Sequence, residues 1–289
     1  MDFLSRLRAG PPIVADGAMG TMLQAAGLPL GKPGEFWVLE RPEVVMSVHR
    51  AYVEAGADLI LTCTFGGTRP RLEKSGLADR IAEVNRRAVE IAREAAAGRA
   101  FIAGDIGPLG EMLAPLGKWS YQEAVDLFAE QAAALAEAGV DVLYIETMSA
   151  LDEARAAVEG ARRAAPHLPI TLTFSFDHHG RTNMGVRPEQ AAKAAQEWGV
   201  VAFGANCGAT LEMTEGALQK MRAAAPDALL IAKPNAGLPR MVAGTPVYDM
   251  TPEEMASFAK RFLALGARII GGCCGSNPDH IRTIAQAVR

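Results

Sequence analysis

The sequence predicts a single (β/α)8 barrel, also called a TIM barrel, with residues 1–289 forming one domain. First, short apolar runs alternate with longer amphipathic runs, and eight such pairs follow one another. Second, runs such as 59–61 and 229–231 are apolar throughout, as parallel strands are when helices cover both faces of a sheet. Third, a length of 289 residues suits one barrel. An open, doubly wound sheet is the alternative fold.

The expected strands are short runs dominated by aliphatic and β-branched side chains, which favour extended backbone. In chain order they cover residues 13–16, 58–64, 101–105, 140–145, 170–176, 200–205, 228–233 and 268–270. Each is followed by a segment long enough for a helix to cross back over the sheet, as parallel pairing requires.

The expected helices have apolar residues at helical spacing. In chain order they cover residues 42–55, 77–97, 120–138, 151–165, 188–198, 211–224, 251–265 and 278–288. The first ends at Gly56, and Pro188 suits the first turn of the fifth. Ser120 and Thr251 each stand three residues before a Glu, at positions 123 and 254. We therefore expect each pair to form a capping box at the start of a helix.

Composition argues against two kinds of partner. The net charge of −4 and pI of about 5.8 give no basic surface for nucleic acid. No apolar run reaches the roughly 18 residues that a membrane helix needs, and the N-terminus lacks a signal-peptide core. We therefore expect a cytoplasmic protein with neither a nucleic-acid nor a membrane partner.

The cysteines are the strongest chemical signal. There are four, Cys63, Cys207, Cys273 and Cys274, and two of them are adjacent, which disfavours a disulfide framework. Cys207 follows the sixth expected strand, whereas Cys273 and Cys274 follow the eighth. Since the carboxyl ends of barrel strands meet on one face, we expect these three thiolates to converge there. They would hold Zn²⁺ with one tetrahedral position open, as catalytic sites do. The alternative is that they are small buried apolar residues.

An open, thiolate-rich zinc site suits a small thiol substrate that is to be alkylated, because zinc lowers the pKa of a bound thiol. A competing interpretation concerns the turn that contains Cys273 and Cys274. Gly271 and Gly272 after the last strand are typical of a barrel that cradles a phosphate group. The two cysteines in the turn argue against this interpretation without removing it.

Two carboxylates stand at strand ends that face each other. Asp16 follows the first strand and Glu146 the fourth, so both can hold a substrate ammonium group. The backbone amides of Gly17 and Ala18 are placed to receive a substrate carboxylate. The alternative is that each acid caps a loop or a helix.

These motifs resemble one known family, the homocysteine S-methyltransferases. The resemblance rests on segments in fixed order along the whole chain, which are 16–21, 64–66, 105–108, 146–147, 206–207 and 271–275. It implies a zinc site at Cys207, Cys273 and Cys274. It also implies a homocysteine pocket that uses Asp16, Glu146 and the Gly17 and Ala18 amides, and an enzyme that forms methionine.

Within the family, segments 234–239 and 275–278 are most similar to the homocysteine module of cobalamin-dependent methionine synthase. The resemblance implies methylcobalamin as the methyl donor. Because the chain ends at Arg289 without a corrinoid-binding module, a separate corrinoid protein is the expected partner. S-methylmethionine, betaine, a different small thiol or selenol acceptor, and a non-catalytic metal- or corrinoid-protein-binding subunit remain alternatives.

Four further residues carry expectations. Asn235 lies between the cysteine-bearing strands, and its amide oxygen is expected to fill the open zinc position when homocysteine is absent. Cys63 stands where methionine synthase modules commonly carry Asn, either changing contacts there or packing as a buried spectator. Phe36 and Trp37 are expected to line the methyl-donor side of the pocket, with ordinary loop packing as the alternative.

Overall fold

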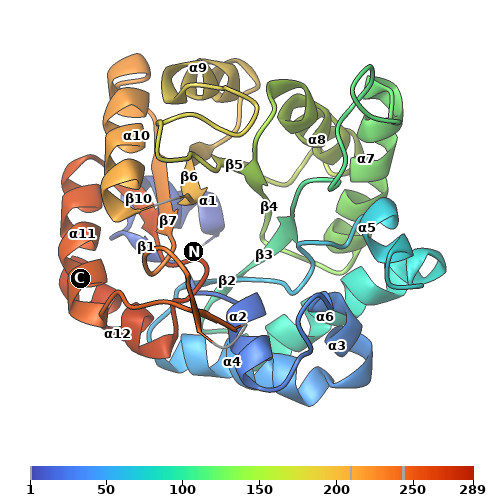
Figure 1. The fold of residues 1–289 in the computed structure, drawn as a ribbon, viewed down its shortest axis with the longest axis horizontal. Helices are drawn as coiled ribbons and strands as arrows, with labels where there is room; N and C mark the ends of the chain where they lie inside the picture. The colour runs from blue at the N-terminus through green and yellow to red at the C-terminus, as the bar shows by residue number, and fades with distance from the viewer. Residues whose placement is uncertain (1, 209, 243–244) are drawn as a thin grey trace.

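The computed structural model describes residues 2–208, 210–242 and 245–289. Its eight parallel strands form a nearly closed barrel in the order β1-β10-β7-β6-β5-β4-β3-β2 (Figure 1). They are β1 (Ile13–Val14), β2 (Leu59–Leu61), β3 (Phe101–Ile106), β4 (Val142–Met148), β5 (Ile170–Phe174), β6 (Ala202–Cys207), β7 (Leu230–Pro234) and β10 (Ala267–Ile270). A parallel bridge between Ala15 and Leu59 joins β1 to β2. The barrel is therefore confirmed, and the open sheet is wrong.

Eight helices surround the strands, as the sequence predicted (Figure 1). They are α4 (Pro42–Glu54), α6 (Ile81–Ala96), α7 (Tyr121–Glu137), α8 (Leu151–Ala164), α9 (Pro188–Glu197), α10 (Leu211–Ala224), α11 (Pro252–Ala264) and α12 (Pro278–Val288). The capping boxes at Ser120 and Thr251 are present. None of the helices in the described ranges is both long and apolar enough to cross a membrane.

Side chains along each strand point alternately outward and inward, which divides the core into an outer and an inner layer. Val14, Ile60 and Ile102 belong to the large cluster between the strands and the helices. Ile13, Leu59 and their counterparts on other strands form a second cluster inside the barrel. Because successive residues of a strand point to opposite faces, each strand must be apolar on both, which explains its unbroken apolar run.

The sequence analysis did not identify several short elements. They are α1 (Phe3–Ala9), α2 (Gly20–Ala25), α3 (Glu35–Glu40), α5 (Arg69–Glu73), a 3₁₀ turn (Ala78–Arg80), and the hairpin of β8 (Arg240–Val242) with β9 (Thr245–Val247). Phe3 and Leu7 of α1 join the inner cluster, so this helix closes the end of the barrel opposite the strands' carboxyl ends. Such elements are too short for a periodic signal.

Some predicted boundaries were also wrong. The second strand is only β2, because the backbone turns after Leu61, where the Thr64 N–H donates to the Thr62 carbonyl at 2.8 Å. The sixth strand instead extends to Cys207, where it pairs with Pro234 of β7. Cys207 therefore lies at the end of β6, beside the turn that follows β10.

Candidate active site at the carboxyl ends of the strands

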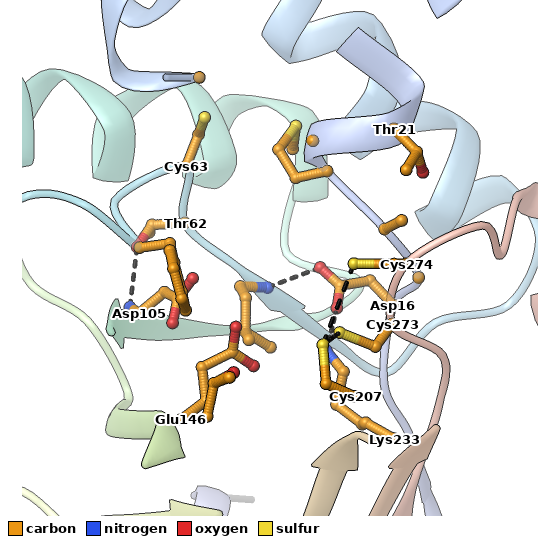
Figure 2. A pocket seen from close by; sticks show the side chains of 18 of the residues that line it. Asp16, Thr21, Thr62, Cys63, Asp105, Glu146, Cys207, Lys233, Cys273 and Cys274 are labelled. Atoms are coloured by element: carbon orange, nitrogen blue, oxygen red, sulfur yellow. Dashed lines mark hydrogen bonds and ion pairs between the residues drawn. The ribbon is translucent and has the colours of Figure 1, made fainter. Parts of the chain in front are cut away.

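A cavity of about 310 Å³ opens at the carboxyl ends of the strands (Figure 2). Residues from strands and turns around the barrel line it, among them Asp16, Cys63, Asp105, Glu146, Lys233 and the three other cysteines. The predicted location of the site is therefore the location of a real pocket.

Three cysteine sulfur atoms meet at one side of this cavity (Figure 2). The Sγ of Cys207 lies 3.2 Å from the Sγ of Cys273 and 3.9 Å from that of Cys274, and all three lie within 4.8 Å of one another. Cys207 has a φ of 54°, an uncommon backbone conformation for a residue with a side chain. The strand end is thus turned so that its thiol faces the turn after β10.

This geometry fits a zinc ion. Three sulfurs about 2.3 Å from a tetrahedral zinc lie about 3.8 Å apart, close to the observed separations of 3.2 and 3.9 Å. Hydrogen bonds from the Cys207 and Cys273 thiols lower the pKa of Cys274 to about 3. Cys274 therefore favours the thiolate, the protonation state that binds a metal, whereas its two neighbours raise the pKa of Cys207.

Backbone hydrogen bonds hold the cysteine turn on the strands beneath it. The N–H groups of Gly271, Gly272 and Cys273 donate to the carbonyls of Ala232, Asp16 and Pro234 at 3.0, 3.0 and 2.7 Å. A phosphate cradle needs such amides to point freely at the ligand. The expected alternative of a phosphate site at Gly271 and Gly272 is therefore wrong.

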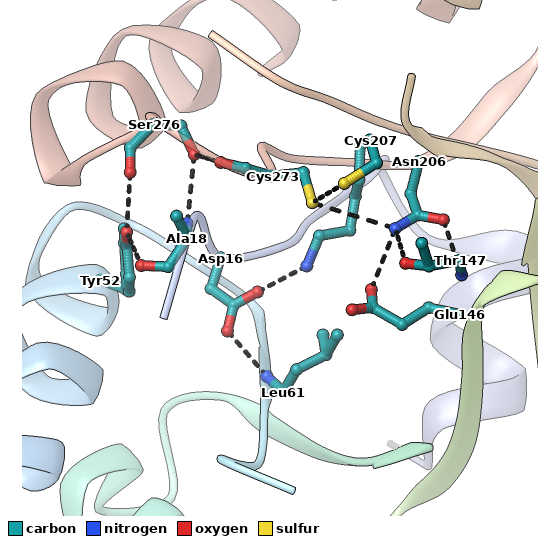
Figure 3. A network of polar contacts seen from close by, with 11 residues as sticks. Asp16, Ala18, Tyr52, Leu61, Glu146, Thr147, Asn206, Cys207, Cys273 and Ser276 are labelled. Carbon is teal, nitrogen blue, oxygen red and sulfur yellow. Dashed lines mark hydrogen bonds and ion pairs between the residues drawn. The ribbon is translucent and has the colours of Figure 1, made fainter. Parts of the chain in front are cut away.

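Asp16 is buried and paired with a lysine that the sequence analysis did not single out. Its Oδ1 lies 2.7 Å from the Nζ of Lys233, and its Oδ2 accepts a hydrogen bond from the Leu61 N–H at 2.8 Å (Figure 3). Burial opposes the charged lysine, but the facing carboxylates of Asp16 and Glu146 raise its pKa above the usual value. A buried ion pair therefore forms part of the cavity wall.

Glu146 and Asp105 are two further acids in the cavity. Burial, followed by the nearby Cys273, raises the pKa of Glu146 to about 8. Burial, followed by the neighbouring Glu146, raises the pKa of Asp105 well above its usual range. The Oδ1 of Asp105 has no hydrogen-bond partner within the described ranges. A cation that enters the cavity would therefore stabilise the charged form of both carboxyl groups.

A buried amide links Glu146 to the cysteines (Figure 3). Asn206 Nδ2 donates to Thr147 Oγ1 at 2.7 Å and lies 3.4 Å from Glu146 Oε2 and 3.9 Å from Cys273 Sγ. Its Oδ1 accepts from the Thr147 N–H at 2.9 Å. Asn206 therefore orients the acid and one sulfur together.

The turn after β1 is packed tightly. A Cβ added at Gly17 would lie 2.7 Å from Ser276 Oγ and 2.8 Å from the Tyr52 ring, so only glycine fits there. The Ala18 N–H donates to Ser276 Oγ at 3.2 Å, and the Ala18 carbonyl accepts from the Tyr52 hydroxyl at 2.8 Å (Figure 3). No such partner is found for the Gly17 N–H among residues with described positions. The two predicted amides thus differ, because only that of Gly17 is unengaged.

Asn235 lies against the cysteine-bearing strand end. Its Nδ2 donates to the Gly208 carbonyl at 3.0 Å, and its N–H donates to the Cys207 carbonyl at 3.4 Å. Its Oδ1 is buried, and the described part of the chain gives it no hydrogen-bond partner. A buried amide oxygen without a partner is costly, which suits an atom that awaits a ligand.

Trp37 and Phe36 do not line this cavity, so that expectation was wrong. Both lie on α3, where Trp37 is buried in the main core and Phe36 packs against it. The α3 side of the cavity is formed by Gly34 and Glu35 instead. Cys63 is buried and lines the cavity, but it does not belong to the cysteine trio.

Comparisons with known proteins show which family the chain belongs to. The family model described as homocysteine S-methyltransferase matches residues 13–288. The chain belongs to this family. This match confirms the resemblance that the motifs indicated. The members of this family are methyltransferases, so the chain is an enzyme of that class.

Two relatives and two solved structures illustrate the similarity. The methionine synthases of Mycobacterium leprae and Mycobacterium tuberculosis are each 36% identical to the chain over an alignment of 294 positions, which covers 96% of this chain but 24% of theirs. The chain thus spans about a quarter of their length. The metallated and oxidized forms of the homocysteine methyltransferase MmuM from Escherichia coli match at 27% and 26% identity. Their TM-scores are 0.79 and 0.81, with 98% and 99% of both chains covered.

Lys233 and Asn206 are two site residues to which the sequence analysis gave no individual role. Lys233 follows the apolar run 229–232, in a strand expected to be buried on both faces. A lysine in that position is seldom buried without a partner, and this signal was available in the sequence. No comparable signal distinguishes Asn206 from an asparagine that merely ends a strand.

Proposed function

We propose that this homocysteine S-methyltransferase family member methylates the thiol of homocysteine to give methionine, with zinc held by Cys207, Cys273 and Cys274. The observation that carries the proposal is the convergence of these three sulfurs, within 4.8 Å of one another, at a cavity that also holds buried carboxyl groups. A small amino acid with a thiol is the substrate class that uses both features.

Zinc bound there would stabilise the substrate sulfur as a thiolate at neutral pH. The chain supplies the remaining conditions. With the three cysteines as its ligands, zinc would keep one of its four tetrahedral positions for the substrate sulfur. Asn235 Oδ1, which is buried without a partner in the described ranges, is the group that we expect in that position when homocysteine is absent. No side chain needs to act as a general base during methyl transfer, because the sulfur is already deprotonated.

We propose that the amino-acid half of homocysteine lies among Asp16, Gly17, Ala18 and Glu146. Glu146 is suited to the ammonium group, since its only hydrogen-bond partner in the described ranges is the distant Asn206 Nδ2 at 3.4 Å. The unengaged Gly17 N–H is suited to the carboxylate. Ala18 can contribute its N–H only by giving up its bond to Ser276 Oγ. Holding both ends orients the sulfur for in-line attack on a methyl group.

For the methyl donor we propose methylcobalamin carried by a separate corrinoid protein. The segment 234–239 and the mycobacterial methionine synthase relatives support this choice. The second candidate is a small soluble donor such as S-methylmethionine or betaine, which the resemblance to the family also allows. A different thiol or selenol acceptor would be indicated if Glu146 proved dispensable.

A comparison of methyl donors tests the proposal. Zinc-loaded protein is incubated with homocysteine and, in separate reactions, methylcobalamin, S-methylmethionine or betaine, and methionine is measured. Methionine formed mainly from methylcobalamin supports the first candidate, and methionine from a sulfonium or betaine supports the second. Absence of methionine with every donor, including methylcobalamin on a corrinoid protein, contradicts homocysteine methylation.

A further inference from the structure

Lys233 is a buried cation for which the proposed reaction has no use. It stands on β7 inside the barrel, is 2% exposed and lines the cavity. Its Nζ donates to Asp16 Oδ1 at 2.7 Å and lies 5.7 Å from the centre of the Tyr144 ring. Burying a lysine costs free energy unless a partner compensates its charge. Its position therefore needs a reason.

The pairing changes what Asp16 can do. One carboxylate oxygen is engaged by Lys233 and the other by the Leu61 N–H at 2.8 Å. The pair adds no net negative charge to the cavity, and a substrate ammonium near Asp16 would meet the like charge of Lys233. Glu146 is less restricted, because no cation lies within salt-bridge distance of it in the described residues, although the charge of Lys233 acts on it from further away.

The same pair lies beneath the cysteine turn. The Asp16 carbonyl accepts the N–H of Gly272 at 3.0 Å, directly before Cys273. On the other side, the carbonyl of Pro234, which follows Lys233, accepts the N–H of Cys273 at 2.7 Å. The Lys233–Asp16 contact therefore ties together the two backbone segments between which Cys273 is held.

We propose that Lys233 is a positioning residue that locks the Asp16 carboxylate as a brace between β1, β2 and β7, leaving Glu146 to receive the substrate amino group. This inference rests on the proposed function, because it divides roles within the homocysteine site. Asp16 then contributes by keeping two turns of the site in place. It holds the turn of Gly17 and the turn of Cys273 while its side chain does not bind substrate.

A double-mutant cycle tests the brace without relying on activity. The variants are Lys233→Met, Asp16→Asn and the two combined, each compared with the wild type by thermal unfolding. Lys233→Met leaves a buried carboxylate without a counter-charge, so its Tm falls most. Adding Asp16→Asn removes that charge, and the Tm of the double variant rises above that of Lys233→Met. Additive losses of Tm would overturn the brace.

Kinetics with homocysteine test the division of roles. In Lys233→Met, the unpaired Asp16 carboxylate draws the amino group away from Glu146. We therefore expect kcat and KM to fall together by about tenfold, as in nonproductive binding, and to recover together in the double variant. Glu146→Gln raises KM by about tenfold or more. Lys233→Arg, which keeps the charge, restores both constants toward the wild type. A merely structural role for Lys233 would reduce kcat and leave KM unchanged.

The opposite assignment gives a different pattern. If the Asp16 side chain held the amino group, Asp16→Asn would raise KM about tenfold or more whether or not Lys233 is present, and Lys233→Met would lower KM at constant kcat. That result overturns the inference. If Lys233→Met fails to fold while the double variant folds, the brace is supported, and failure of both contradicts it. A wild-type protein that neither binds nor methylates homocysteine would reject the proposed function, whereas the unfolding cycle would still decide the brace.

Discussion

Asn206 holds two polar groups of Thr147, accepting from its N–H at 2.9 Å and donating to its Oγ1 at 2.7 Å. Thr147 has a φ of 61°, a conformation that a β-branched residue adopts only when its surroundings fix it. Because Asn206 also reaches Glu146 and Cys273, one buried amide joins the Glu146 side of the cavity to the cysteine side.

Two threonines on β5 offer a matched test of this network. Thr173 Oγ1 donates to Asn206 Oδ1 at 2.7 Å, whereas Thr171 Oγ1, equally buried, lacks a partner in the described ranges. We expect Thr173→Val to lower the free energy of unfolding by about 1 kcal/mol, and Thr171→Val to leave it unchanged or raise it. Denaturant unfolding measures both. Equal losses would show that the bond to Asn206 contributes nothing specific.

Replacing the amide itself affects substrate and metal together. Asn206→Asp keeps an acceptor for Thr147 and Thr173 but loses the Nδ2 donor and adds a negative charge beside Glu146. We expect the KM for homocysteine to rise about tenfold and zinc to pass faster to a chelator. Steady-state kinetics and a chelator competition give the two values. An unchanged rate of zinc loss would separate Asn206 from the cysteines.

Two cysteines in the cavity should respond oppositely to substitution. Cys207→Ala removes one of three converging sulfurs, so we expect loss of bound zinc and of methyl transfer. Cys63→Ala is the matched control, since Cys63 lines the same cavity outside the trio. It should keep its zinc content. Metal analysis after gel filtration decides, and zinc lost from the Cys63 variant would contradict the assignment of ligands.

Two glycines near each other in sequence should differ in tolerance. A Cβ at Gly17 would lie 2.7 Å from Ser276 Oγ, whereas a Cβ at Gly20 has nothing within 4 Å among described atoms. We expect Gly17→Ala to lower Tm and weaken homocysteine binding. Gly20→Ala, at the start of α2, should be neutral or stabilise by up to about 1 kcal/mol. A Gly17 variant that keeps wild-type Tm and KM would show that the turn is not closely packed.

His49 gives stability a pH dependence away from the active site. It is fully buried on α4, with neither ring nitrogen bonded in the described structure. Burial lowers its pKa from 6.5 to about 4. The unfolded chain therefore binds the extra proton first, and stability, full above about pH 6.5, falls as the pH drops toward 4, by up to about 1.4 kcal/mol per unit.

The His49→Leu variant isolates this contribution. It lacks the titrating group, so its stability relative to the wild type should increase as the pH is lowered from 7 to 5. Urea unfolding at both values measures the difference. A constant difference between the two proteins would mean that His49 is not held neutral in the fold.

The barrel and the cysteine trio were predictable from sequence because both depend on repeated or clustered signals. Alternating strand and helix patterns persist along the chain, and a barrel brings all strand ends together. Cys207 and Cys273 were thus placed on one face without knowledge of any distance. The eight outer helices were found for the same reason, with ends displaced by a few residues at most.

What could not be predicted depends on side-chain direction. Trp37 was expected at the pocket, but α3 turns it into the core. The pairing of Asp16 with Lys233 joins positions 217 residues apart. The sequence signals that a buried lysine needs a partner, but not which residue that partner is. The hydrogen bond that occupies the Ala18 N–H likewise arises from Ser276, on the far end of the chain.

The most direct test of the account compares metal-free protein, prepared with a chelator, with the same protein after zinc is restored. Methyl transfer to homocysteine and bound zinc are measured on both samples with the donor that supports turnover. We predict that activity is lost with the metal and returns as zinc approaches about one ion per chain. Methyl transfer by the metal-free protein at the wild-type rate would contradict the central claim that Cys207, Cys273 and Cys274 act through zinc.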